Sequence, residues 1–244
     1  MRHRYGEHFH QFADLYMPRD AEGPSAVAVV LHPGFWREEY TLETSEDLAR
    51  DLSQRGWAAW NVEYRRVGEV SGGGYPATLE DVAAAIDFLQ TLDEPLDLAR
   101  VVTVGQSAGG QLALWAARRE APAVPLAGAV SQAGIPDLRE ADRLGIGDGA
   151  ARAFMGGSAS EIPDRYADAS PIEKVPLGVP QLLLHGEADD VVPPSLSVAY
   201  AEAAREAGDD VDLVLRHGDD HSVHLDPSGG AWGEVVRWLG RFAA

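Results

Sequence analysis

The chain has 244 residues, of which 45% are hydrophobic and 24% charged, so it is long enough to bury one sizeable core. Its 39 acidic and 20 basic residues give a formal net charge of −19, and we therefore expect neither nucleic acid nor an anionic membrane surface as a partner. Cysteine is absent, which excludes disulfides, thiolate catalysis and Cys-ligated metal centres.

The N-terminal residues are polar and include His3, His8 and His10, which we expect to lie in a solvated terminal segment. This segment has no apolar targeting core, and no apolar run long enough to cross a membrane occurs in the sequence. A cytoplasmic location is therefore the default expectation.

From residue 26 onwards, short apolar runs alternate with segments of helical periodicity. Such alternation predicts an α/β fold with a mainly parallel sheet and helices on both faces. Residues 135–177 break the alternation, and we expect them to form a small lid insertion within a single domain spanning 1–244. Strands are expected over 26–32, 57–64, 100–105, 126–134, 180–186 and 211–218, and helices over 42–55, 77–92, 108–119, 196–207 and 231–242.

Polar or glycine-rich stretches follow four of these strands, at the edge of a parallel sheet where catalytic groups gather. In chain order they are H-P-G-F-W (32–36), G-Q-S-A-G (105–109), H-G-E-A-D-D-V-V-P (185–193) and H-G-D-D-H (217–221). A serine hydroxyl becomes a good nucleophile only when an imidazole takes its proton and a carboxylate orients that imidazole. The last three stretches supply a serine, an aspartate and a histidine in that order.

The serine of G-Q-S-A-G, Ser107, stands between a predicted strand and a predicted helix. Flanking glycines at 105 and 109 permit the sharp turn of a nucleophile elbow, which exposes the serine above the sheet. A tetrahedral intermediate also needs hydrogen-bond donors for its oxyanion. We expect the backbone N–H of Ala108 to be one donor and the loop at 32–36 to supply another.

Together these stretches resemble the α/β-hydrolases, and within them the small esterases and arylformamidases (kynurenine formamidase-like) with an H-x-G-x-W loop. The resemblance covers nearly the whole chain and includes D-L-Y-x-P, N-V-E-Y-R-R, Y-P-A-T-L-E-D and A-S-P-I. Parts also resemble hormone-sensitive-lipase-type esterases, although the long N-terminal cap of that group is missing. The resemblance implies Ser107 as nucleophile, Asp189 as acid and His221 as base, with oxyanion-hole amides at Gly34, Phe35 and Ala108 and no cofactor or metal.

The loop departs from the family at Pro33, where glycine is common, because proline has no N–H to donate. Nothing is lost if the donors are the next two positions, Gly34 and Phe35. We expect this arrangement, since proline also stiffens a loop whose donors must be aimed in advance.

Several alternatives compete with this interpretation. Ser107 could be an ordinary turn residue, and His32 and His185 are expected to brace their loops rather than act as bases. The triglycine at 72–74 lacks the G-K-[ST] of a phosphate loop, and no G-x-G-x-x-G is present. A metal site could be formed by His217, His221 and His224 with Asp219, Asp220 and Asp226, although no H-E-x-x-H helix exists. An acyl or leaving-group pocket could be lined by Trp36, Tyr64, Tyr75 and Phe154, with core packing as the simpler role for each.

The sequence thus predicts a serine hydrolase that cleaves small carboxylic esters through an acyl-enzyme. An arylformamidase acting on N-formyl aryl amides and a catalytically silent binding protein of the same fold are the alternatives, and a peptidase is less expected because no added domain could sieve peptides. We expect Asp189 to hold His221, Asp190 to point toward solvent or a local turn, and His224 to be mostly dispensable for catalysis. The natural substrate and the oligomeric state stay open.

Overall fold

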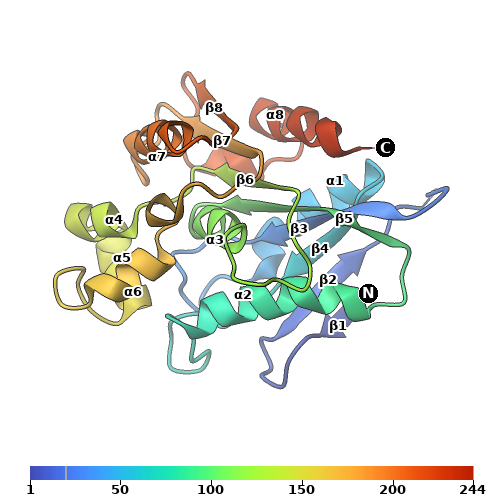
Figure 1. The fold of residues 1–244 in the computed structure, drawn as a ribbon, viewed down its shortest axis with the longest axis horizontal. Coiled ribbons are helices and arrows are strands. Elements are labelled where there is room, and N and C mark those ends of the chain that lie inside the picture. Colours follow the sequence, from blue (N-terminus) through green and yellow to red (C-terminus); the bar gives the residue numbers. More distant parts are fainter. Residues whose placement is uncertain (20, 244) are drawn as a thin grey trace.

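The structure is a computed structural model that describes residues 1–19 and 21–243. Eight strands form one sheet in the order β1-β2-β4-β3-β5-β6-β7-β8 (Figure 1). The strands are β1 (Arg2–Arg4), β2 (Phe12–Tyr16), β3 (Ser25–Leu31), β4 (Ala58–Val62), β5 (Leu96–Gln106), β6 (Gly128–Gln132), β7 (Gln181–Gly186) and β8 (Val211–Arg216). The α-helices are α1 (Glu46–Gln54), α2 (Ala77–Asp87), α3 (Ala108–Ala116), α4 (Leu138–Leu144), α5 (Ile146–Met155), α6 (Pro163–Ala169), α7 (Ser195–Glu206) and α8 (Gly230–Leu239).

Strands β3 to β8 pair in parallel, which places their carboxyl ends along one edge of the sheet. Strands β3, β4, β6 and β7 are buried along their whole length. A strand covered on both faces needs a continuous apolar run, and this is why these strands are visible in the sequence. This mainly parallel sheet is the one that the alternation of apolar runs with helical segments predicts.

The N-terminal segment is not the solvated tail that its composition indicates. Strand β2 pairs antiparallel with β4, and β1 pairs antiparallel with β2 at the sheet edge. In β2, the alternate residues Ala13 and Leu15 are buried. This strand therefore shows the two-residue period of a strand that is buried on one face only. His3, His8 and His10 are half-buried, and His10 Nδ1 lies 2.9 Å from Ser71 Oγ.

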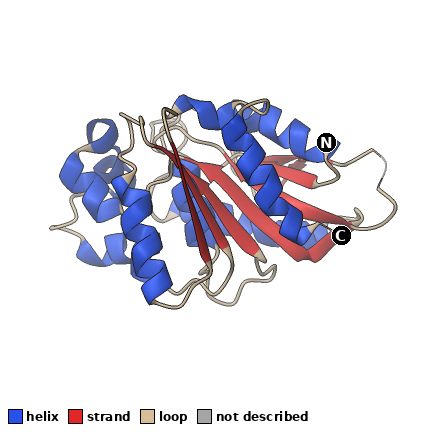
Figure 2. Ribbon diagram, turned by 90° about the horizontal axis from the view of Figure 1, so that it is seen from above, coloured by secondary structure: helices blue, strands red, loops and turns tan. Residues whose placement is uncertain are grey.

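Helices cover both faces of the sheet (Figure 2). Apolar residues of α1 and α8 pack on one face, as in the contacts of Leu52 and Trp232 with the cluster around Val104. On the other face, α2 packs against β4, α3 packs against β5 and β6, and α7 packs beside β7 and β8. None of the helices within 1–19 and 21–243 is long and apolar enough to cross a membrane.

The segment between β6 and β7 contains α4, α5 and α6, which gather at one end of the molecule beside α3 and α7 (Figure 1). Apolar residues of all three helices belong to the same core cluster as α2 and α3. Helix α5 is kinked at its start because Gly147, Asp148 and Gly149 have left-handed backbone conformations, with φ of 59°, 52° and 77°. This kink faces the loop that follows β3, because a Cβ at Gly147 would meet the ring of Phe35.

Candidate active site

Ser107 occupies a sharp turn between β5 and α3. Its backbone has φ 55° and ψ −119°, a region that non-glycine residues adopt only when the surrounding structure enforces it. The two flanking glycines explain how the turn is packed. A Cβ at Gly105 would lie 2.0 Å from the Gly109 carbonyl oxygen, and one at Gly109 would lie 2.0 Å from the Leu31 carbonyl oxygen. Glycine at both positions therefore lets α3 approach β5 and β3 closely.

Asp189 and His221 come from the loops after β7 and β8 and are in contact. Asp189 Oδ2 lies 2.7 Å from His221 Nδ1, and Oδ1 accepts the N–H groups of Val191 and Val192 at 2.9 and 2.8 Å. Burial raises the pKa of Asp189, but hydrogen bonds from His185, His221 and Val192 outweigh burial and hold that pKa well below its usual value. The carboxylate is thus kept charged and fixes one ring nitrogen of His221.

His185 braces the Asp189 loop from within the core. Its Nδ1 lies 2.7 Å from Ser197 Oγ, and its Nε2 lies 2.9 Å from the Val192 carbonyl oxygen and 3.2 Å from Asp189 Oδ2. The side chain is buried, so it cannot receive a proton from a substrate. These contacts fit the bracing role expected from the sequence.

The His221 loop is tied directly to the serine turn. Gln106, the residue before Ser107, donates its side-chain N–H to the His221 carbonyl oxygen at 3.1 Å. Across the described residues, no hydrogen bond joins the Ser107 hydroxyl to the His221 ring. Such bonds commonly tighten only when substrate is bound.

The loop after β3 presents free backbone donors. Gly34, Phe35 and Trp36 have φ of 121°, 54° and 57°. Within the part of the chain that the structure describes, no hydrogen bond is made by the N–H groups of Gly34 and Phe35, or by that of Ala108 at the start of α3. The sequence predicted these three amides as oxyanion donors, and all three are available for that role.

A buried polar network that the sequence analysis did not identify lies behind this loop. His32 Nε2 lies 3.2 Å from Glu63 Oε1, and Glu63 also forms a buried ion pair with Arg66. Although burial raises the pKa of Glu63, His32 and Arg66 lower it by more. The signal was present in N-V-E-Y-R-R, where charged residues directly follow a mostly apolar, fully buried strand.

Three of the four aromatic residues proposed for a substrate pocket are core residues instead. Trp36 and Phe154 are each 1% exposed and stack with ring centroids 4.7 Å apart. Tyr64 is fully buried, stacks on His32 at 4.2 Å and donates its hydroxyl to the His32 carbonyl oxygen at 2.7 Å. Only Tyr75 is partly exposed, with its hydroxyl 3.2 Å from Asp168 Oδ2.

The histidines of the alternative metal site are not brought together. The His217 side chain is 98% exposed and pairs with Glu187, whereas His224 is buried. Among residues 1–19 and 21–243, no group of three side chains is arranged to ligate a metal ion. The loop therefore separates these histidines, and His221 alone of the three contacts Asp189.

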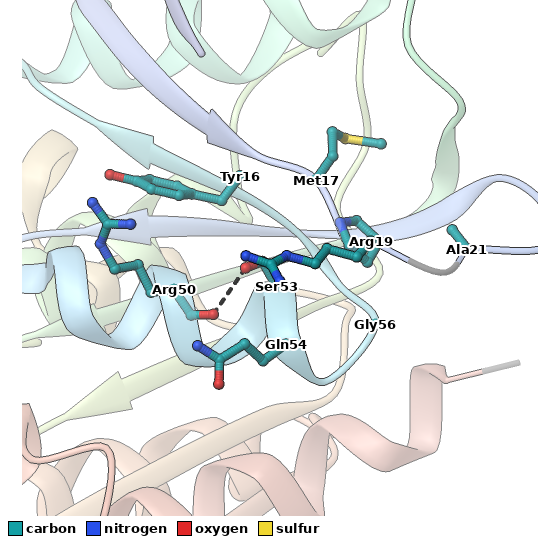
Figure 3. A pocket seen from close by; sticks show the side chains of 9 residues that line it. Tyr16, Met17, Arg19, Ala21, Arg50, Ser53, Gln54 and Gly56 are labelled. Atoms are coloured by element: carbon teal, nitrogen blue, oxygen red, sulfur yellow. Dashed lines mark hydrogen bonds between the residues drawn. The ribbon is translucent and has the colours of Figure 1, made fainter.

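A cavity of about 430 Å³ opens elsewhere, at the end of β2 and the C-terminal end of α1 (Figure 3). Tyr16, Arg19, Arg50 and Ser53 contribute to its lining. Tyr16 lies beside Ala59, near the amino end of β4. This cavity is therefore at the sheet edge opposite Ser107 and does not belong to the candidate site.

Comparison with known proteins relates this arrangement to esterases. A relative from Oryza sativa subsp. japonica, named probable isoprenylcysteine alpha-carbonyl methylesterase ICME, is 28% identical over 95% of this chain, which spans 60% of the rice protein. The protein YfhR of Salmonella typhimurium, which is uncharacterized, is 26% identical over 95% of this chain and 75% of its own length.

Two solved structures share the fold. A truncated carbohydrate esterase from gut microbiota superposes with a TM-score of 0.84 at 18% identity, over 99% of this chain and 94% of that one. Thermogutta terrifontis esterase 2, in a form phosphoramylated by tabun, gives a TM-score of 0.79 at 20% identity, over 99% and 92% of the two chains.

The BD-FAE family model matches residues 13–203, a stretch that includes Ser107 and Asp189 and ends before His221. This match covers well over half of the sequence. The chain therefore belongs to the BD-FAE family of esterase-type hydrolases with the α/β-hydrolase fold.

Proposed function

We propose that this protein hydrolyses small carboxylic esters, with Ser107 as nucleophile, His221 as general base and Asp189 as the carboxylate that orients it. The 2.7 Å contact between Asp189 and His221, at the same sheet edge as the strained Ser107 turn, carries this proposal. With Nδ1 held by a charged carboxylate, the other ring nitrogen of His221 is free to accept a proton.

The reaction follows from these positions. His221 takes the hydroxyl proton as Ser107 Oγ attacks the ester carbonyl carbon, and the resulting oxyanion accepts hydrogen bonds from the N–H groups of Gly34, Phe35 and Ala108. Collapse breaks the bond to the alcohol, which leaves with the proton from His221. Water then attacks the acyl-enzyme, with His221 again as base, and releases the carboxylic acid and Ser107.

An ester substrate is favoured over an N-formyl aryl amide. The resemblance to arylformamidases depends on the H-x-G-x-W loop, but Trp36 is in the core and does not face a substrate. In addition, three of the similar proteins are esterases by name: a probable methylesterase, a carbohydrate esterase and Thermogutta terrifontis esterase 2.

The test is hydrolysis of nitrophenyl esters of increasing acyl length, with formylkynurenine for comparison and an organophosphate as the covalent label. We expect turnover of the short esters, loss of activity in Ser107→Ala, and stoichiometric labelling of Ser107 located by peptide mass spectrometry. Ser131→Ala is the matched control, because Ser131 is a buried serine paired with Gly105 on the neighbouring strand. Labelling of another residue, or undiminished turnover by Ser107→Ala, contradicts the assignment, and a wild type without turnover indicates a silent relative.

A further inference from the structure

One side chain, that of Gln111, connects three parts of the candidate site that are distant in the sequence. Its Oε1 accepts the indole N–H of Trp36 at 3.0 Å, and its Nε2 donates to the Ala169 carbonyl oxygen at 2.9 Å. Trp36 follows the free amides of Gly34 and Phe35, and Ala169 ends α6 of the insertion. Gln111 itself lies in the first turn of α3 and donates its backbone N–H to the Ser107 carbonyl oxygen at 3.2 Å.

The loop that carries the free amides is held in a strained shape. Phe35 and Trp36 are consecutive non-glycine residues in the left-handed region, a conformation that persists only where surrounding contacts enforce it. Those contacts converge on Trp36, because its ring stacks on Phe154 and its N–H reaches Gln111. Both partners are fully or almost fully buried, so water does not compete for the bond.

We propose that Trp36 and Gln111 are positioning residues that aim the N–H groups of Gly34 and Phe35 at the tetrahedral intermediate formed on Ser107. This inference rests on the proposed function of Ser107. An amide suits the position because it accepts from the indole and donates to the Ala169 carbonyl at the same time. Methionine has a similar shape but cannot donate and accepts only weakly, and phenylalanine at position 36 keeps the ring stacking while losing the N–H.

We expect the loss of either side chain to weaken binding of the transition state and not binding of the substrate. Free donors that are slightly misaligned still let the neutral ester bind but stabilise the developing oxyanion poorly. Loss of one complete oxyanion donor costs about 10²- to 10³-fold in kcat in a serine protease, so displacement of two donors should cost about 10- to 100-fold. KM should stay within about twofold, because the ground state gains little from these amides.

The experiment compares kcat, KM and thermal unfolding of Trp36→Phe, Gln111→Met and the double variant on a short nitrophenyl ester. Trp60→Phe is the matched control, because Trp60 is equally buried and its indole N–H donates to the Ala85 carbonyl oxygen at 2.9 Å, far from Ser107. We expect Trp60→Phe to lower the unfolding temperature and leave kcat unchanged. Both site variants should lower kcat. The double variant should lose no more activity than the worse single variant, because both substitutions remove the same hydrogen bond between Trp36 and Gln111.

Binding of a trifluoromethyl ketone, which forms a tetrahedral adduct with the nucleophile, provides a second measurement. Its affinity should fall in parallel with kcat in Trp36→Phe and stay unchanged in Trp60→Phe. The inference is overturned if Trp36→Phe matches Trp60→Phe in kcat, or if the two site losses multiply in the double variant. The comparison of these two phenylalanine variants decides the question even if Gln111→Met fails to fold. Retained activity in Ser107→Ala would instead overturn the proposed function.

Discussion

Asp189 and Asp190 are adjacent in the chain but lie in different surroundings. Asp189 is buried, and its two oxygens contact His221 and the N–H groups of Val191 and Val192. Asp190 is exposed. The fourth residue after His185 therefore faces the site, and the fifth faces solvent, as the spacing of the motif predicts.

This difference predicts opposite outcomes for the same substitution. Asp189→Asn keeps the shape but favours the wrong imidazole tautomer, a change that lowers kcat about 10⁴-fold in a serine protease. We expect a smaller but still large loss here, and a change of less than about twofold for Asp190→Asn. Ester turnover of both purified variants, with circular dichroism to confirm folding, measures the effect. If Asp190 were the essential carboxylate, the assignment of the loop after β7 would be wrong.

His224 is a buried histidine on the same loop as His221, with a different role. Within the described residues, neither of its ring nitrogens has a hydrogen-bond partner. Burial, together with the nearby His185 and His221, lowers the pKa of His224 to about 4. The side chain is therefore held neutral in the folded protein.

This lowered pKa predicts how stability depends on pH. An unfolded histidine takes up a proton near pH 6.5, so the free energy of unfolding should fall as the pH drops from about 6.5 to about 4. At about 1.4 kcal/mol per pKa unit, the loss is of the order of 3 kcal/mol, and this histidine contributes no pH dependence above pH 6.5. The Asp189 carboxylate adds a loss only at more acid pH, below its ordinary pKa of about 3.9.

Urea unfolding at a series of pH values tests the assignment to His224. His224→Phe should flatten the curve between pH 6.5 and 4, whereas His217→Phe, at a fully exposed histidine, should leave the wild-type slope in place. An unchanged slope in His224→Phe would show that another group takes up the proton. Ester hydrolysis by His224→Phe should remain close to that of the wild type.

At the scale of elements, the kink of α5 is packed against the loop that carries the candidate oxyanion donors. A Cβ at Gly147 would lie 2.5 Å from both Cδ1 and Cε1 of Phe35. Arg37 donates to the Gly147 carbonyl oxygen and lies over the Phe35 ring, 5.5 Å from its centroid. The segment between β6 and β7 thus contacts this loop at two places: Gly147 packs on Phe35, and Phe154 stacks on Trp36.

Two glycines of the kink make a matched pair for testing this contact. Gly147 and Gly149 are both left-handed, but nothing lies within 4 Å of a Cβ built at Gly149. Alanine at either position should cost about 1 kcal/mol of stability. Only Gly147→Ala should also displace Phe35 and lower kcat, which we expect to fall about tenfold or more. Equal kcat in the two variants would mean that the Phe35 contact does not matter for catalysis.

The elements differ in how well the sequence predicts them. The central strands are buried and mostly apolar because helices cover both faces, and their predicted bounds lie within a few residues of the observed ones. Strands β1 and β2 were missed because both are short, β1 has no apolar residue, and only alternate residues of β2 are buried. The helix expected over 42–55 begins instead as a 3-10 turn at Leu42–Ser45, a boundary that hydrophobic periodicity does not resolve.

The residues of the candidate site also differ in how well the sequence predicts them. Ser107, Asp189 and His221 each lie in a short motif at a strand end, so local sequence identifies them. Gln111 could not be found in this way, because its partner Trp36 is 75 residues away and glutamine in a helix has no special signature. Pairing across such a distance depends on tertiary packing, which a single sequence does not display.

At the scale of the whole molecule, the net charge of −19 acts on every charged ligand that approaches. The Debye length is about 30 Å at 0.01 M salt and about 8 Å at 0.15 M, so this field reaches beyond the surface only at low salt. Anionic esters should be repelled and cationic esters attracted, whereas a neutral ester should be indifferent.

Measuring kcat/KM at 0.01 M and 0.15 M sodium chloride tests this expectation with three acyl esters of similar size. Hydrolysis of an anionic ester, such as a nitrophenyl hemisuccinate, should become about two- to tenfold faster at the higher salt, because screening removes the repulsion. A cationic ester such as acetylthiocholine should become slower, and nitrophenyl acetate, the neutral control, should not change. The opposite result for the anionic ester would mean that a local positive charge outweighs the net charge.

Arg37 would then be the first candidate for that charge. It forms no ion pair with any carboxylate in the described ranges, and it directly follows the loop with the free amides. Arg37→Gln would abolish such a reversed salt dependence, and it should have no effect on the salt dependence if the net charge alone is responsible.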